Sequence, residues 1–260
     1  MIGQLELRNK LMSYNLDTLP HTILLLGEDG CGKHTLSKEL ADYFGIGLID
    51  ITDNINQETI ESIYLSAFQT FYLINTSKIT ERQQNMLLKL IEEPSKLAYI
   101  LLIGENKLSL LNTILNRCVI FDFKSYSIDE LKQFTSEEDT RLFNLCTTPG
   151  QLKSMNLNKM DELYVLCTNI LTKLSVARLP STLNIVNKLN FKDNYDKFEV
   201  TVFFRALLQK SLELYTTGVI NSSSYRIIDN YIKKSIDSRV NKNYLIQSML
   251  IELWKESHNG

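Results

Sequence analysis

Residues 27–33 carry the clearest chemical signal in the chain. They read Gly27-Glu28-Asp29-Gly30-Cys31-Gly32-Lys33 and fit the phosphate-binding pattern G-x-x-x-x-G-K. Glycines let several backbone N–H groups converge on a phosphate, a helix start adds partial positive charge, and the lysine reaches the outer phosphates. A glycine-rich turn that merely joins a strand to a helix is the alternative. The full match between an apolar run and a helical pattern favours a nucleotide site, with ATP or ADP as the ligand.

The residues after Lys33 bear on magnesium. The pattern has Ser or Thr directly after the lysine to hold the metal, but this chain has His34, with Thr35 one place further on. One helical position turns a side chain by about 100°, so Thr35 cannot simply take that place. Magnesium coordination of the usual kind is therefore not expected. The predicted nucleotide-binding residues are Gly27, Asp29, Gly30, Cys31, Gly32, Lys33, His34 and Thr35.

A second position speaks against hydrolysis. The apolar strand predicted at Phe71–Ile74 leads into Asn75 and Thr76, where a nucleotide hydrolase would carry an acidic pair to hold the metal and orient the attacking water. Neither side chain accepts a proton at neutral pH, and loss of a general base typically costs about 10²- to 10⁴-fold in rate. We therefore expect intrinsic ATP hydrolysis to be negligible or very slow.

Strands and helices alternate over the first half of the chain. Thr80 with Gln83 predicts a capping box for a helix that stops before Pro94. This alternation predicts an α/β fold, a parallel sheet with helices on both faces. The predicted strands are 22–26, 48–51, 71–74, 98–103 and 119–123, and the helical patterns between them cover 5–14, 33–44, 56–68, the segment after Thr80, and roughly 108–115.

The second half of the chain reads as helical. Ser127–Glu130 is a capping-box pattern, residues 128–145 predict two short helices, and everything from about residue 160 is helical. The last three helices are expected at roughly 197–217, 223–237 and 241–256. The last of them carries an apolar stripe of Tyr244, Leu245, Met249 and Leu253, widened by Ile246 and Leu250.

Composition excludes several classes of protein. The formal net charge is -2, which argues against a surface that alone grips a polyanion over many phosphates. There is no signal-peptide pattern at Met1 and no apolar run of roughly 20 residues, so we expect a cytoplasmic protein. The 4 cysteines stand singly, without a C-x-x-C pair, and are expected to be buried free thiols, with no metal site and no zinc.

Four segments, in the same order, resemble the AAA+ clamp-loader family, and most closely its delta-prime-like members. They are 19–21, the phosphate loop, 79–94 (like M-T-x-x-x-Q-N-A-L-L-K-x-L-E-E-P) and 110–118 (like L-L-x-T-I-x-S-R-C). Thr148-Pro149-Gly150 resembles the start of the family's lid. The resemblance implies an AAA+ domain at 1–124, a helical lid at 125–158 and a helical collar for oligomerisation at 159–260.

The resemblance also gives a role to Arg117. In the family this position is an arginine finger, a guanidinium presented to the ATP of the neighbouring subunit, where such groups supply about 10³- to 10⁵-fold in rate. A surface arginine paired with a carboxylate is the alternative. Asn116 in place of the family's Ser is a modest departure. Gly104 in place of a phosphate-sensing polar residue and Gln151 in place of the lid arginine, together with His34, Asn75 and Thr76, resemble delta-prime-like members rather than motor subunits.

The implied function is assembly in DNA replication. The resemblance implies a largely ATPase-inactive subunit of a hetero-oligomeric ring that loads a sliding clamp on primed DNA, with other loader subunits, the clamp and primer-template DNA as partners. One alternative is an ATP-hydrolysing motor subunit of the loader. The other is a P-loop protein, similar to helicase loaders or initiators, that binds single-stranded DNA directly; salt-sensitive binding by the isolated chain would favour it.

Overall fold

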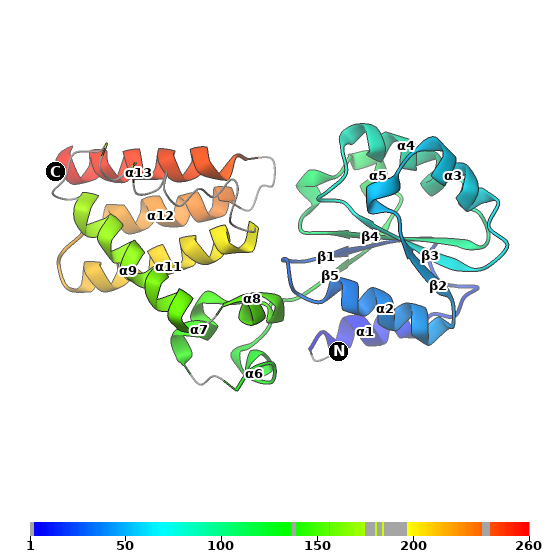
Figure 1. Cartoon of the computed structure of the whole chain (residues 1–260), viewed down its shortest axis with the longest axis horizontal. Helices are drawn as coiled ribbons and strands as arrows, with labels where there is room; N and C mark the ends of the chain where they lie inside the picture. Colours follow the sequence, from blue (N-terminus) through cyan, green and yellow to red (C-terminus); the bar gives the residue numbers. More distant parts are fainter. Residues whose placement is uncertain are drawn as a thin grey trace. The chain divides into compact units, whose positions relative to one another are not determined.

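The structure is a computed structural model that describes residues 3–136, 139–155, 157–174, 197–235 and 240–259, together with residues 180 and 184. The chain forms two compact units (Figure 1). The first comprises Met1–Gln133 and Thr148–Gly150, and the second comprises Phe134–Thr147 and Gln151–Gly260. The three-part division at residues 124 and 158 stays a prediction.

The first unit is built on a 5-stranded parallel sheet. Its strands lie in the order β2-β3-β4-β1-β5, so the strand before the phosphate loop is enclosed between two neighbours. All five residues of β1 and all seven of β4 are buried, as expected for apolar runs in a parallel sheet. The strands are β1 (Thr22–Leu26), β2 (Gly47–Asp50), β3 (Thr70–Asn75), β4 (Ala98–Gly104) and β5 (Val119–Asp122).

Helices cover both faces of this sheet, which confirms the predicted α/β architecture (Figure 1). Successive strand residues point to opposite faces, so β1 contributes to two cores. Ile23 and Leu25 pack with α1 (Leu5–Met12) and α2 (Lys33–Phe44). Leu24 and Leu26 pack with α3 (Gln57–Tyr64) and α4 (Glu81–Glu92).

Both predicted capping boxes are present. The Thr80 hydroxyl accepts from the Gln83 backbone and the Gln83 side chain accepts from Thr80, which opens α4. Ser127 and Glu130 make the same pair of bonds at the start of α6 (Ile128–Lys132). These local rules worked because each cap satisfies backbone donors that a helix start leaves unpaired.

Two predicted helices have other bounds. The helix expected to reach Phe68 ends at Tyr64, since Leu65 and Phe68 are 84% and 79% exposed and do not continue its packed face. The helix expected at 108–115 is split into a 3₁₀ turn, Lys107–Ser109, and α5 (Asn112–Leu115). The helix is split because the Gln84 side chain of α4 forms hydrogen bonds with the Ser109 carbonyl and the Leu111 N–H.

The second unit is helical within the described residues. Its main helices are α7 (Thr140–Leu145), α9 (Leu157–Leu174), α11 (Lys197–Thr216), α12 (Ser222–Ser235) and α13 (Lys242–Asn259), and α8 (Pro149–Ser154) begins in the first unit. α11 packs against α9 and α12, and α12 packs against α13 (Figure 1). Among the described helices, none is long and apolar enough to cross a bilayer.

The apolar stripe predicted for α13 is confirmed with one correction. Five of its members are buried: Leu245, Ile246, Met249, Leu250 and Leu253. Tyr244 is 69% exposed and does not belong to the stripe. It precedes Leu245 by one residue in the first turn, so it points about 100° away. The predicted thiols are free, with Cys31, Cys146 and Cys167 buried and Cys118 half-buried.

Candidate functional site

The phosphate-binding motif lies where its chemistry requires, between the buried strand β1 and the start of α2. Gly30 and Gly32 have φ values of 73° and 103°, a left-handed backbone that residues with a side chain rarely adopt. Gly32 is the N-cap of α2, so the loop leads directly into the positive end of that helix. The local sequence thus produces the loop conformation that a phosphate site needs.

Lys33 is held against the loop itself. Its side chain is buried, and its Nζ donates to the carbonyl oxygens of Gly27 at 2.7 Å and Glu28 at 2.8 Å. The Cys31 Sγ lies 3.7 Å from the same nitrogen. Burial raises the pKa of the Cys31 thiol, although the nearby ammonium opposes that shift. The ammonium is therefore fixed at the loop by two backbone acceptors.

A second segment of the first unit closes onto the loop. The Thr148 hydroxyl donates to the Asp29 carbonyl at 2.9 Å, and the Gly150 N–H donates to the Gly30 carbonyl at 3.0 Å. The two backbones cross so closely that a Cβ built on Gly150 would lie 2.4 Å from the Gly30 Cα. A side chain at either glycine would displace the backbone at the other glycine. The predicted Thr148-Pro149-Gly150 motif is thus part of the loop's support.

The two residues after Lys33 lie on the exposed start of α2. His34 and Thr35 are both exposed, and the buried hydroxyl of this turn is Ser37, which donates to the Lys33 carbonyl. Partial loss of hydration lowers the pKa of His34, and the nearby Lys33 charge acts in the same direction. An imidazole therefore occupies the sequence position of the metal-binding hydroxyl.

At the end of β3, the residues that replace the acidic pair are bonded within the sheet. The Asn75 Oδ1 accepts from the Ser77 N–H at 3.0 Å, and the Thr76 hydroxyl donates to the Ile103 carbonyl at 3.1 Å. A Cβ built on Gly104 would lie 2.5 Å from the Thr76 Oγ1. Thr76 thus fills the space in which a polar side chain at position 104 would begin, and the two departures fit each other.

Gln151 is 2% exposed and has a packing role in the second unit. Its Oε1 accepts from the Thr147 N–H at 2.8 Å and from the Arg205 Nη1 at 3.3 Å. The same Arg205 nitrogen donates to the Leu145 carbonyl at 3.2 Å. The residue at the position of the lid arginine therefore joins three helical segments of its own chain.

Arg117 stands at the surface, directly before β5. Its side chain is 40% exposed. The guanidinium Nη1 donates to the Thr113 carbonyl at 2.8 Å, and Nη2 lies 2.9 Å from the Glu92 Oε1. Arg117 is thus paired with a carboxylate of its own chain, yet it is not enclosed in the core.

Two residues of α4 support the Arg117 segment, and sequence reasoning gave neither of them this role. Gln84 is 5% exposed, its Nε2 donates to the Ser109 carbonyl and its Oε1 accepts from the Leu111 N–H, both at 2.9 Å. These bonds use the backbone groups that a continuous helix over 108–115 would need. Glu92, at the end of the same helix, pairs with Arg117. Both contacts join residues about 25 positions apart, so no local pattern reveals them.

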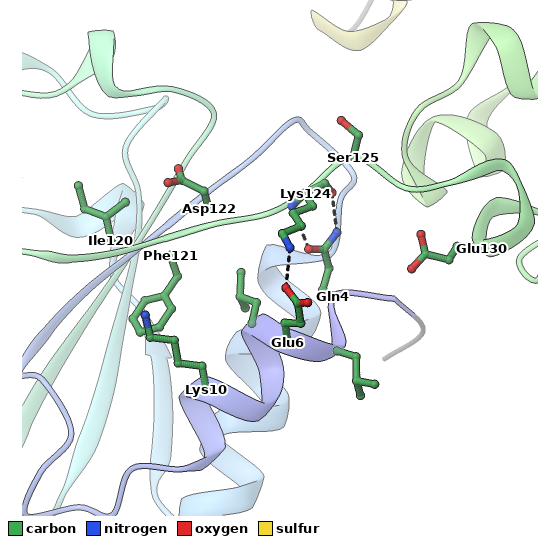
Figure 2. Close-up of a pocket in the computed structure, with 11 residues that line it drawn as sticks. Gln4, Glu6, Lys10, Ile120, Phe121, Asp122, Lys124, Ser125 and Glu130 are labelled. Atoms are coloured by element: carbon green, nitrogen blue, oxygen red, sulfur yellow. Dashed lines mark hydrogen bonds and ion pairs between the residues drawn. The ribbon is translucent and has the colours of Figure 1, made fainter.

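A separate hollow of the first unit lies away from these residues. It measures about 570 Å³ and lies between α1 and the segment that starts in β5 (Figure 2). Lys124 crosses it to reach Glu6 at 2.5 Å, and the Gln4 side chain bonds the Lys124 backbone twice. The predicted site residues do not line it; its lining residues are Gln4, Leu5, Glu6, Leu7, Lys10, Ile120, Phe121, Asp122, Lys124, Ser125 and Glu130.

The described residues offer no clustered metal ligands. No three side chains of His, Cys, Asp or Glu come together within the described ranges. The candidate site therefore consists of the phosphate loop with its supports and, separately, the exposed guanidinium of Arg117.

Comparison with known proteins gives matches in sequence and in structure. Residues 45–127 match the family described as DNA polymerase III, delta subunit. The delta-prime subunit of DNA polymerase III from Buchnera aphidicola is 32% identical over 88 residues, which are 34% of this chain and 26% of that protein. The chain thus spans about a quarter of the length of the curated relative that it matches.

The chain also resembles solved structures. A DNA polymerase III gamma subunit-related protein from Thermotoga maritima superimposes with a TM-score of 0.50 and 15% identity, covering 98% of this chain and 100% of that one. The RuvB Holliday junction branch migration motor of the same organism gives a TM-score of 0.48 at 18% identity, covering 95% and 88%. The first of these likenesses concerns the fold alone, a parallel sheet with helices on both faces. Over its central region, the chain is therefore similar in sequence to delta and delta-prime subunits of DNA polymerase III.

Proposed function

We propose that this chain is a largely non-hydrolysing clamp-loader subunit that supplies Arg117 to the nucleotide of a neighbouring motor subunit. The observation that carries the proposal is a contrast within the first unit. The end of β3 lacks a carboxylate pair and is bonded internally, whereas the Arg117 side chain is 40% exposed at the surface.

The phosphate loop of this chain is suited to bind a nucleotide phosphate rather than to hydrolyse the nucleotide. The loop from Gly27 to Lys33 has the left-handed glycines and the fixed ammonium that would hold the phosphates of ATP or ADP. Asn75 and Thr76 offer no base for an attacking water, and no hydroxyl follows Lys33 directly. A nucleotide bound here would therefore act as a structural ligand.

Arg117 is the group that would act in trans. Its planar guanidinium keeps its charge at any physiological pH and can offset charge on a transferring phosphate. Together with the resemblance to delta-prime-like subunits, this supports partners of three kinds: other loader subunits in a hetero-oligomeric ring, a sliding clamp, and primed DNA held by the assembly. A net charge of -2 is consistent with DNA contacts shared among subunits.

The test is reconstitution with candidate motor and clamp-opening subunits, followed by DNA-stimulated ATP turnover. Arg117→Ala should lower turnover by about 10³-fold or more, and Arg117→Lys should recover little, because an ammonium lacks the planar fork. Lys33→Ala should leave turnover within about twofold, because in this proposal the neighbours hydrolyse the ATP. Unchanged turnover for Arg117→Ala in an assembly shown to be intact would contradict the proposal.

A further inference from the structure

We infer that Glu92 is a positioning residue that orients the Arg117 guanidinium for the phosphate of a neighbouring subunit. This inference rests on the proposed function. Glu92 lies in the last turn of α4, and Arg117 lies 25 positions later, directly after α5. The Glu92 Oε1 is 2.9 Å from Nη2, while the Thr113 carbonyl takes the bond from Nη1.

The two contacts fix the plane of the guanidinium. One acceptor sits on each terminal nitrogen, and the acceptors come from different helices, α4 and α5. A planar fork held at two points cannot rotate freely, and its other N–H groups remain available for an anionic oxygen. With the side chain 40% exposed, such an oxygen can approach from outside the chain.

The placement of Glu92 itself points to this role. A carboxylate in the last turn of a helix is unfavourable, because the helix end carries partial negative charge. The Arg117 cation offsets that repulsion across the gap between α4 and α5. Gln84, near the other end of the same helix, bonds Ser109 and Leu111, so α4 holds the Arg117 segment at two places.

Glu93 provides a matched control. It is the same residue type, also exposed, and directly follows Glu92. Its charge acts on Tyr64 of α3, whose pKa is raised chiefly by burial and in addition by Glu93. A variant of Glu93 therefore changes the net charge by the same amount at the neighbouring position.

Loss of Glu92 should lower the rate of the chemical step and leave nucleotide binding alone. Arg117 would keep its charge but would reach the transferring phosphate from a wider range of rotamers. Because exposed ion pairs are weak, we expect Glu92→Gln to lower kcat of the neighbouring subunit about two- to fivefold, with KM for ATP unchanged. Glu92→Asp should recover part of the loss.

The experiment measures kcat and KM for ATP in the reconstituted loader with wild type, Glu92→Gln, Glu92→Asp, Glu93→Gln, Arg117→Ala and the Glu92→Gln/Arg117→Ala double variant. Glu93→Gln should match wild type, and the double variant should match Arg117→Ala alone. Native mass spectrometry confirms that each assembly is complete.

The outcomes separate the inference from the function on which it rests. Should Arg117→Ala lower turnover while Glu92→Gln and Glu93→Gln both match wild type, the role of Glu92 is wrong and the proposed function stands. An increase in kcat for Glu92→Gln, or a further loss in the double variant, also overturns the inference, because Glu92 then restrains Arg117 or acts independently of it. No effect of Arg117→Ala would contradict the proposed function itself.

Discussion

The phosphate loop and the Arg117 segment belong to the same unit but differ in their surroundings. The loop keeps its motif, its left-handed glycines and its buried lysine, yet the residues beside it at the end of β3 are bonded to their own sheet. The Arg117 segment has no motif of comparable length, yet its guanidinium is exposed and anchored by two helices. The motif predicts phosphate binding, whereas in our proposal the neighbouring side chains determine whether hydrolysis follows.

The supports of the two regions also differ in kind. The loop is held mainly by backbone contacts, the Gly30 and Gly150 crossing and the carbonyls bonded to Lys33. The Arg117 segment is held by two side chains of α4. Gln84 bonds backbone groups of Ser109 and Leu111, and Glu92 forms an ion pair with Arg117. Substitutions should therefore damage the loop through steric strain and the Arg117 segment through lost hydrogen bonds.

The largest effect on stability is expected at the loop crossing. Gly30→Ala places a methyl group 2.7 Å from the Gly150 Cα and forces a side chain into a φ of 73°. We expect the free energy of unfolding to fall by about 2–4 kcal/mol in urea denaturation. Gly45→Ala is the control, because Gly45 has a φ of 66° and no heavy atom within 4 Å of a built Cβ. It should cost about 1 kcal/mol. Equal losses for the two variants would show that the crossing does not matter.

A smaller effect is expected at Gln84. Gln84→Met keeps the volume but leaves the Ser109 carbonyl and the Leu111 N–H without their partner. Unsatisfied buried groups of this kind cost about 1–3 kcal/mol. Hydrogen exchange should speed up at the Leu111 amide and stay unchanged in β1. An unaltered Leu111 amide would mean that Gln84 does not hold the Arg117 segment.

The smallest effect is expected at Tyr126, whose hydroxyl donates to the Cys31 carbonyl at 2.8 Å. Tyr126→Phe should cost about 1 kcal/mol at neutral pH. Burial raises the pKa of Tyr126 from 10.0 to about 12, so the folded state favours the protonated phenol. That stabilisation is complete below pH 10 and is lost as the pH rises toward 12. Between pH 10 and 12 the free energy of unfolding should therefore fall less for Tyr126→Phe than for wild type. The same pH dependence for both proteins would contradict a buried Tyr126 hydroxyl.

Features encoded in short stretches could be predicted from the sequence. The buried strands appear as apolar runs, and the caps at Thr80 and Ser127 follow from residues three positions apart. The phosphate loop is visible because its glycines and lysine are contiguous. Local pattern failed where a helix stops for lack of a surface to pack on, as after Tyr64, or where a distant side chain takes its backbone bonds, as with Gln84.

Other features depend on contacts that only the fold creates. Thr76 and Gly104 are each a departure in sequence, but their fit to one another appears only when β3 and β4 lie side by side. The Gly30 and Gly150 crossing joins positions 120 residues apart, and the Arg117 pair with Glu92 joins two helices. The sequence indicated the candidate site residues, whereas the residues that support them could be found only in the structure.

The most direct test of the central claim compares ATP turnover by the isolated chain with turnover by the reconstituted loader. Both are measured with wild type, Lys33→Ala and Arg117→Ala. The account predicts turnover at background level for the isolated wild-type chain, and a loader whose activity survives Lys33→Ala but is lost with Arg117→Ala. Rapid turnover by the isolated chain that Lys33→Ala abolishes would contradict it, because the chain would then cleave its own nucleotide.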